Sequence, residues 1–252
     1  MNFDTFTNYE EFELPSKGLI YSKPINPEVS LRSMTTLEEM KRQSPTETPY
    51  KLMCDIIEDC MIKKPEVSVY DMCIGDYLFL LHKLRIITYG PEYKLAVRCP
   101  NCGEISDQVI NLDELGVLEY TDDIQSLKTL KLPQSGLTIT LNYQTPRMLD
   151  RIEKRNKEDK RRAKENYVDL RLVYTIANLI NTVDGNIIDM NEKEALARKL
   201  PMRDVNLLIS QAEKINRKVG IDTSIVCDCA ECGYKIATYF RNTSEFFRPH
   251  LD

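Results

Sequence analysis

Two Cys-x-x-Cys-Gly units constrain the fold of this chain more than any other feature of its sequence. One unit runs from Cys99 to Gly103, and the other runs from Cys229 to Gly233. Two intervening residues let both sulfurs of a unit reach one metal ion from a tight turn (a knuckle), and the glycine that follows can adopt a left-handed backbone. We therefore predict one structural Zn2+ per chain, with the ligands Cys99, Cys102, Cys229 and Cys232.

Four thiolates complete a tetrahedral zinc site and leave no position for water, which predicts a structural metal rather than a catalytic one. Two alternatives stay open. Cys227 would lie on the same side of a strand as Cys229 and could replace it, although the resulting CxC unit is tighter. An iron–sulfur cluster could also use four thiolates, but knuckles carried by strands are more typical of zinc. Because 126 residues separate Cys102 from Cys229, folding and metal loading are expected to be coupled.

Each knuckle lies between two segments that alternate apolar and polar residues, as the strands of a hairpin do. Residues 92–111 and 222–241 are therefore predicted to be the two strand-knuckle-strand halves of a zinc ribbon. Each half has a net charge of −1, and the metal-bound thiolates add further negative charge, so the ribbon should repel phosphate. It also lacks interleaved aromatic and basic residues on which bases could stack. A scaffold role is favoured over nucleic-acid binding.

The other cysteines, and the start of the sequence, indicate a reducing compartment. Five of the eight cysteines lie close to the two knuckles, and we interpret Cys54 and Cys60 as ordinary packing residues. Residues 1–10 are acidic and polar, where a secretion signal would be basic and then apolar, and no apolar run approaches the roughly 18 residues of a membrane span. We expect a cytoplasmic protein without membrane contact, in which disulfides would be rare.

The predicted fold class is α+β, with a mainly helical core, the two-knuckle zinc ribbon and an extended N-terminal arm. A chain of 252 residues that is 42 % hydrophobic can bury a large core. The expected organisation is an extended arm and short helix at 1–46, a helical core at 47–91, the ribbon at 92–111 plus 222–241, an inserted hairpin and helical region at 112–221, and a C-terminal tail at 242–252.

Capping signals and periodicity place the helices of the core. Thr36 with Glu39 predicts a capping box at the start of a short helix, and 48–65 is predicted to be a second helix closed by its two lysines and a proline. The segment 72–87 has hardly any polar face, so it is predicted to be the central helix. We interpret His82 within it as a hydrogen-bonded core or boundary residue, and a catalytic or metal role is the alternative.

The inserted region is predicted to be one hairpin followed by an all-helical block. The hairpin spans 127–143, and the block contains a buried segment at 167–180 and helices that begin near Asn191 and Pro201. Between hairpin and block, residues 147–165 hold nine basic and five acidic residues, so the rest of the chain has a net charge of −9.

Residues 147–165 have more than one interpretation. Glu153 with Lys157, and Glu158 with Arg162, have the spacing of helical charge pairs, which favours a solvated helix stabilised partly by its own ion pairs. A docking helix for an acidic partner is the second interpretation. A helix that contacts phosphate is the third.

The first 30 residues combine three prolines and a glycine with apolar residues, which favours an extended arm that needs a surface. Its docking onto another protein is the functional interpretation, with aromatic anchors supplying most of the affinity. The alternative is that the arm packs along its own core as an edge strand and coil. The apolar residues concerned are Phe3, Phe6, Phe12, Leu14, Leu19 and Tyr21.

The sequence contains no pattern of a known catalytic or nucleotide-binding site. Its nine glycines form no GxxxxGK[ST] loop, no GxGxxG turn and no GxSxG elbow, and its two histidines form no HExxH pair. We therefore expect a protein that is not an enzyme and has no small-molecule substrate.

Three stretches occur in an order that is familiar from one family. Together they resemble the baseplate hub family of T-even-type bacteriophages, most clearly over residues 12–110. The stretches are Leu14-Pro15-Ser16-Lys17-Gly18-Leu19-Ile20-Tyr21 followed by Val29-Ser30-Leu31-Arg32, then Asp76-Tyr77-Leu78-Phe79-Leu80-Leu81, then Leu84-Arg85-Ile86-Ile87-Thr88-Tyr89-Gly90.

The resemblance implies a non-enzymatic protein that belongs to the central hub of a contractile phage tail baseplate or helps to assemble it. Structural subunits and assembly helpers (chaperones) of the hub look alike in sequence. Its partners would be other phage baseplate hub proteins, and its location would be the host cytoplasm during assembly or the virion tail baseplate. The alternative function from another class is a zinc-ribbon regulator that touches nucleic acid through the basic helix 147–164.

Overall fold

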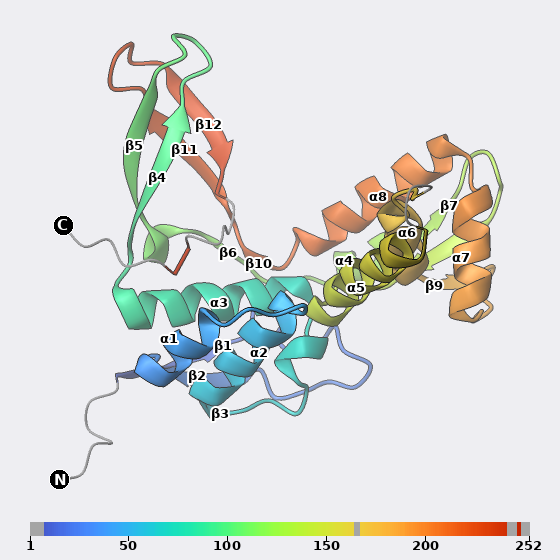
Figure 1. The fold of residues 1–252 in the computed structure, drawn as a ribbon, viewed down its shortest axis with the longest axis horizontal. Coiled ribbons are helices and arrows are strands. Elements are labelled where there is room, and N and C mark those ends of the chain that lie inside the picture. The colour runs from blue at the N-terminus through green and yellow to red at the C-terminus, as the bar shows by residue number, and fades with distance from the viewer. Residues whose placement is uncertain (1–7, 164–166, 241–245, 248–252) are drawn as a thin grey trace.

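The computed structural model describes residues 8–163, 167–240 and 246–247. Its described residues form eight α-helices and several small sheets, so the α+β class is confirmed (Figure 1). The helices and the paired hairpins form a body, a helical lobe beside it and a projection above it. None of the helices in these ranges is long and apolar enough to cross a membrane.

The body combines a small antiparallel sheet with three helices. The central helix is almost wholly apolar, as expected, and most of its residues are buried. The sheet has the strand order β1-β2-β3. The elements are β1 (Tyr9–Glu13), β2 (Glu28–Arg32), α1 (Thr36–Arg42), α2 (Pro49–Cys60), β3 (Met61–Lys63), a short 3-10 turn at Val69–Asp71, and α3 (Ile74–Tyr89).

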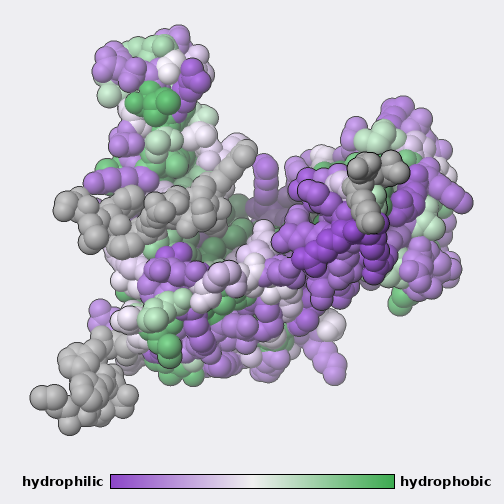
Figure 2. All heavy atoms as spheres, viewed as in Figure 1, coloured by the Kyte–Doolittle hydropathy of each residue, from purple (hydrophilic) through white to green (hydrophobic). Residues whose placement is uncertain are grey.

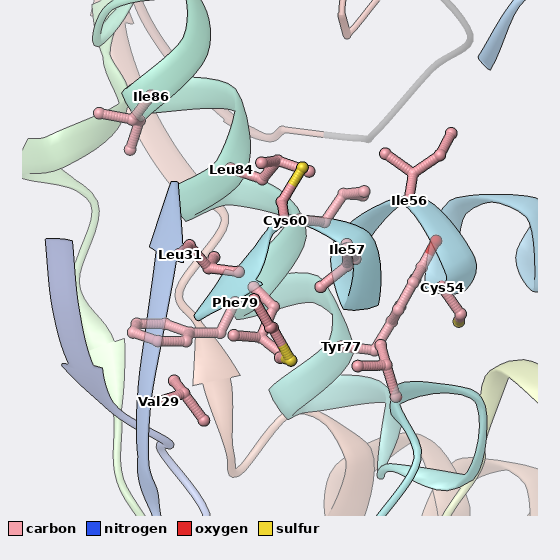
Figure 3. Packing of buried hydrophobic residues seen from close by; sticks show 14 of the residues in the cluster. Val29, Leu31, Cys54, Ile56, Ile57, Cys60, Tyr77, Phe79, Leu84 and Ile86 are labelled. Atoms are coloured by element: carbon pink, nitrogen blue, oxygen red, sulfur yellow. The ribbon is translucent and has the colours of Figure 1, made fainter. Parts of the chain in front are cut away.

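The body's hydrophobic core lies between α2, α3 and the sheet (Figure 3). Leu31 from β2, Ile57 from α2 and Leu84 from α3 are completely buried. Each fully buried aliphatic side chain contributes about 1.5–3 kcal/mol of hydrophobic free energy. Cys54 and Cys60 are also completely buried here, so their interpretation as packing residues is confirmed.

The helical lobe has a second hydrophobic cluster around a three-stranded sheet of order β7-β8-β9. The predicted hairpin supplies β7 and β8. The elements are α4 (Asp123–Leu127), β7 (Thr129–Lys131), β8 (Thr138–Leu141), α6 (Arg171–Leu179), β9 (Ile180–Val183), α7 (Met190–Lys199) and α8 (Met202–Asn216).

The prediction of an all-helical block after the hairpin is wrong, because β9 adds a third strand to β8. The Asn142 amide explains where α6 ends: its Nδ2 donates to the carbonyl oxygens of Asn178 at 3.1 Å and Ile180 at 3.2 Å. These bonds satisfy carbonyls that a helix leaves unpaired at its C-terminus. The chain can then pair with β8 directly after Leu179.

The long charged helix α5 (Pro146–Ala163) connects the body to the lobe (Figure 1). Its buried Asp150 accepts hydrogen bonds from the backbone N–H of Tyr50 at 3.3 Å and of Lys51 at 2.7 Å. These two donors belong to the first turn of α2, whose own N-cap, Thr48, makes no side-chain cap bond. A carboxylate at a helix N-terminus is favourable, so Asp150 caps α2 from another element.

The projection consists of two antiparallel hairpins, which we call the cysteine hairpins (Figure 1). Their strands confirm the predicted strand-knuckle-strand pattern in both halves. At their base, a two-stranded ladder pairs β6 (Val117–Leu118) with β10 (Gly220–Ile221). The hairpin strands are β4 (Glu92–Arg98), β5 (Ile105–Asn111), β11 (Ser224–Asp228) and β12 (Lys235–Tyr239), and a 3-10 turn at Leu112–Glu114 follows β5.

The structure corrects the prediction for the N-terminal arm. Residues 8–22 do not need another protein's surface, because β1 pairs with β2 and Leu14 is completely buried in the body. Phe12 also packs against this core, with its ring 6.0 Å from that of Phe79. The alternative, an edge strand and coil on the chain's own core, is what the structure shows here. Phe3 and Phe6 lie outside the described residues.

The structure also corrects the predicted C-terminal tail, at residues 246–247. Phe246 and Phe247 are buried in the body's core, and the backbone oxygen of Phe246 accepts a hydrogen bond of 2.9 Å from Arg85 in α3. Burying two adjacent aromatic side chains in the core is more favourable than leaving them in water, which explains why this segment packs into the body.

Three helix boundaries differ from the prediction. The capping box of α1 is formed by Thr35 and Glu38, one residue earlier than expected, and that of α7 begins at Asp189. Helix α2 ends at Cys60, because residues 61–63 pair with β2 as β3 instead of continuing the helix.

Candidate metal centre

The structure brings the four predicted cysteines together, although they come from opposite halves of the sequence. The sulfur atoms of Cys99, Cys102, Cys229 and Cys232 all lie within 4.8 Å of one another. Cys99 Sγ is 3.7 Å from Cys232 Sγ, and Cys102 Sγ is 3.6 Å from Cys229 Sγ. A tetrahedron with zinc–sulfur bonds of about 2.3 Å has edges of about 3.8 Å. The donor set and its spacing therefore fit one tetrahedral metal ion.

The two knuckles have the same backbone geometry. In the first, the Gly103 N–H donates to the Cys99 carbonyl at 3.0 Å; in the second, the Gly233 N–H donates to the Cys229 carbonyl at 2.9 Å. Both glycines adopt the left-handed conformation, with φ of 79° and 66°. An L side chain is disfavoured at such angles, which explains the glycine after each CxxC.

Burial differs within each knuckle. Cys99 and Cys229 are buried, whereas Cys102 and Cys232 are exposed. The Asn101 side-chain amide donates to Cys232 Sγ at 3.6 Å, and this hydrogen bond is the main reason why the pKa of the Cys232 thiol is lowered to about 6. The thiolate is the form of cysteine that binds metal, so this hydrogen bond favours metal binding.

Cys227 lies in β11, outside the cluster of four sulfurs. Its thiol approaches the backbone oxygen of Ile236 on the neighbouring strand at 3.9 Å, and burial raises its pKa. Between the hairpins, Val97 and Ile236 pack beside Cys99 and Cys229 in a small hydrophobic cluster. Two of the four fully buried members of this cluster are thus candidate metal ligands.

His82 is not part of this cluster of cysteines. It is buried in α3, and its ring lies 4.8 Å from the ring of Phe246 and 5.4 Å from that of Phe240. These contacts favour the interpretation of His82 as a core residue.

Four sulfurs around one point leave no open coordination position, so the centre can hold structure together but offers no site for a substrate.

Sequence reasoning missed a second polar cluster, which lies inside the body. Asp76 is completely buried at the start of α3 and accepts hydrogen bonds from the Ser16 N–H at 3.0 Å, from the Ser16 hydroxyl and from the Tyr21 hydroxyl at 2.6 Å. Burial raises the pKa of Asp76, and the hydrogen bonds from Ser16 and Tyr21 oppose that rise. The available signal was a single acid in the first turn of an otherwise apolar helix.

The loop that meets Asp76 has a backbone that only certain residues tolerate. Gly18 has φ of +70°, and a Cβ at this position would lie 2.1 Å from the backbone oxygen of Ile25. The loop around Ser16 and Tyr21 therefore folds back on itself and onto α3. Two of the three stretches that carry the family resemblance meet at this point.

One comparison with known proteins found a match. The family model described as "T4 bacteriophage base plate protein" matches residues 7–248 of the chain. No curated protein matches the chain, and no solved structure matches it.

Proposed function

Because this chain belongs to the T4 bacteriophage base plate protein family, we propose that it is a structural or assembly protein of the baseplate hub, stabilised by one structural zinc. The family match over residues 7–248 is the observation that carries this proposal. Membership in that family favours a structural, non-enzymatic role. It also implies contact with other phage baseplate proteins and a place in the virion tail baseplate.

The finer parts of the proposal rest on the chain itself. The order of the three sequence stretches supports the hub as its place within the baseplate, with other hub proteins as partners. Assembly would begin in the host cytoplasm. We also propose that 92–111 and 222–241 act together as one zinc ribbon, with 112–221 inserted between its halves.

The zinc is supported by the distances between the four sulfurs and by the matching knuckles. In this proposal Cys99, Cys102, Cys229 and Cys232 hold the ion, and the ion ties the two cysteine hairpins together. The metal would replace the large hydrophobic core that this small projection lacks. Structural zinc sites contribute on the order of 10 kcal/mol or more to the folding of the units that they close.

The zinc proposal is tested with two serine variants of the purified chain. We expect Cys229→Ser to lose the metal and much of the thermal stability, and Cys227→Ser to keep both, because only Cys229 lies in the sulfur cluster. Metal analysis by inductively coupled plasma mass spectrometry and a thermal melt supply the measurements. The reverse pattern would assign the second knuckle to Cys227, and iron in place of zinc would overturn the metal identity.

The hub proposal is tested by locating the protein during infection. Tailed particles and baseplate hub intermediates are purified from infected cells and analysed by mass spectrometry. A structural subunit is recovered with both, whereas an assembly helper is recovered with the intermediates alone. Recovery with neither fraction would contradict the proposal.

A further inference from the structure

The outer face of α5 carries a group of exposed cations to which the proposed function gives no role. Arg151, Lys154, Lys157 and Arg162 are all exposed and, within the described ranges, none of the four forms an ion pair. Steps of three and eleven residues place them on one side of a helix. Figure 2 shows hydrophilic residues over the visible side of α5. We call these four residues the cationic face.

The helix that carries the cationic face is held in place by two of its buried polar side chains. Asp150 binds the N-terminus of α2 and also accepts from the Tyr70 hydroxyl at 3.1 Å. Six residues further on, the buried Asn156 accepts a hydrogen bond of 3.2 Å from the Leu170 N–H. The cations therefore stand on a helix that is already ordered, so binding need not order the backbone first.

Other cations of α5 are occupied. Arg147 pairs with Asp71 at 2.5 Å, and Arg161 pairs with Glu47 at 2.7 Å. The internal pairs that the sequence predicts, Glu153 with Lys157 and Glu158 with Arg162, are not formed among the described residues, and the ion pairs of α5 reach other elements instead. The four residues of the cationic face remain exposed to solvent and available to a carboxylate partner.

We propose that the cationic face of α5 binds an acidic segment of another protein. This inference rests on the proposed contact role and names the chemistry of one partner. Glu158 lies between the cations on the same side of the helix, and Glu47 lies beside Arg161. A nucleic-acid backbone presents a phosphate at every nucleotide and meets these acids, whereas a protein segment can place its carboxylates opposite the cations alone.

The charge of the remaining chain points the same way. Outside 147–165 the chain has a net charge of −9. A long nucleic acid that extends beyond the cationic face is therefore repelled by the negatively charged remainder of the chain. A short acidic segment is too small to reach the negatively charged surface around the cationic face. The size of the patch therefore favours a protein segment over nucleic acid.

The test compares two quadruple variants of the full chain. In the first, Arg151, Lys154, Lys157 and Arg162 are changed to glutamine. In the matched control, four exposed lysines on β7, α7, α8 and β12 are changed to glutamine: Lys131, Lys199, Lys214 and Lys235. Both variants have a net charge of −9 instead of −5, so a difference between them reports position and not total charge.

Fluorescence anisotropy measures binding to a labelled peptide of alternating Glu and Ser residues, to the matching Gln and Ser peptide, and to a short DNA duplex. We expect the acidic peptide to bind wild type and the control variant, and to bind the α5 variant at least roughly tenfold more weakly. Thermal melts should match, because all eight side chains are exposed. Equal affinity of the two variants, absence of binding to wild type, or tighter binding of DNA than of the acidic peptide would overturn the proposal.

The assay is independent of the hub proposal. If the protein is absent from particles and hub intermediates while the peptide result holds, the hub role fails and the acidic-partner inference stands. If the protein is found there while the α5 variant binds the peptide normally, only the inference fails.

Discussion

Tyr21 anchors the N-terminal loop through a hydrogen bond to Asp76 that is shielded from water. Its hydroxyl lies 2.6 Å from the Asp76 carboxylate, and a hydrogen bond to a buried charged group contributes about 1.5–3 kcal/mol. We therefore expect Tyr21→Phe to lower the free energy of unfolding by about 2 kcal/mol in urea titrations. Tyr9→Phe is the control, because Tyr9 is 64 % exposed and should give no change. Equal stability of Tyr21→Phe and wild type would show that the loop is held by Leu14 packing instead.

Glu38 couples stability to pH. The hydrogen bond from Arg32, at 2.9 Å, is the main cause that lowers the pKa of Glu38 to about 2, and Thr35 adds two more donors. Because the folded pKa lies below the ordinary value of 4.5, Glu38 contributes stability above pH 4.5, and that contribution is lost as the pH falls towards 2.

Glu38→Gln should therefore cost about 2 kcal/mol at neutral pH, and progressively less in acid. Chemical denaturation at pH values between 7 and 3 measures the two curves. They should converge on the acid side. A constant gap across this range would mean that the loss is one of hydrogen-bond geometry and not of charge.

At the level of single residues, the sequence identified the cysteines but not Asp76. Spacing within a CxxCG unit is local, so four ligands could be named before their distances were known. The partners of Asp76 lie 55 and 60 residues earlier in the chain, and no local pattern links them. The capping box of α1 was predicted one residue too late, because Thr35 and Thr36 are adjacent and either can cap a helix.

Helix α3 and strand β10 are held together by a direct contact of their backbones at two glycines. A Cβ on Gly75 would lie 2.1 Å from the backbone oxygen of Val219, and a Cβ on Gly220 would lie 2.8 Å from the backbone oxygen of Gly75. Alanine normally stabilises a helix by about 1 kcal/mol relative to glycine. Here the clash with backbone atoms must outweigh that gain, because neither atom can move away cheaply.

We expect Gly75→Ala to lower the melting temperature by several degrees or to prevent folding, corresponding to about 2 kcal/mol or more. Gly116→Ala is the matched control, since the nearest atom to its Cβ would be Asp222 Cβ at an ordinary 3.6 Å. Differential scanning calorimetry of both variants gives the comparison. An unchanged melting temperature for Gly75→Ala would show that the contact between α3 and β10 can open without cost.

Elements with a strong local signal were predictable, and elements defined by pairing were not. The apolar run of α3 and the alternation in the cysteine hairpins are properties of short segments. Strands β3 and β9 each follow a helix directly, and they are strands only because β2 and β8 offer them a free edge. Periodicity cannot report that edge, so α2 was expected to run too far and β9 was missed.

At the scale of the whole molecule, the buried side chains of the described residues form three separate hydrophobic clusters. The body and the lobe each have a large one, whereas the buried members of the cluster between the cysteine hairpins are Val97, Cys99, Cys229 and Ile236. A unit with so little buried apolar surface does not fold on its own without a metal or a disulfide. The division of the chain into domains stays a prediction, and the separate clusters make it testable.

Zinc removal should therefore affect the molecule unevenly. We expect chelation at neutral pH to increase amide hydrogen exchange in residues 92–111 and 222–241, where the metal replaces a core, while α2, α3 and α8 stay protected because their clusters contain none of the proposed ligands. Exchange measured by mass spectrometry before and after chelation shows which segments respond, and restored protection on adding zinc back is the control. If protection is lost together along the whole chain, the hairpins are not a separate unit, and the metal stabilises the body and the lobe through the long loop that it closes.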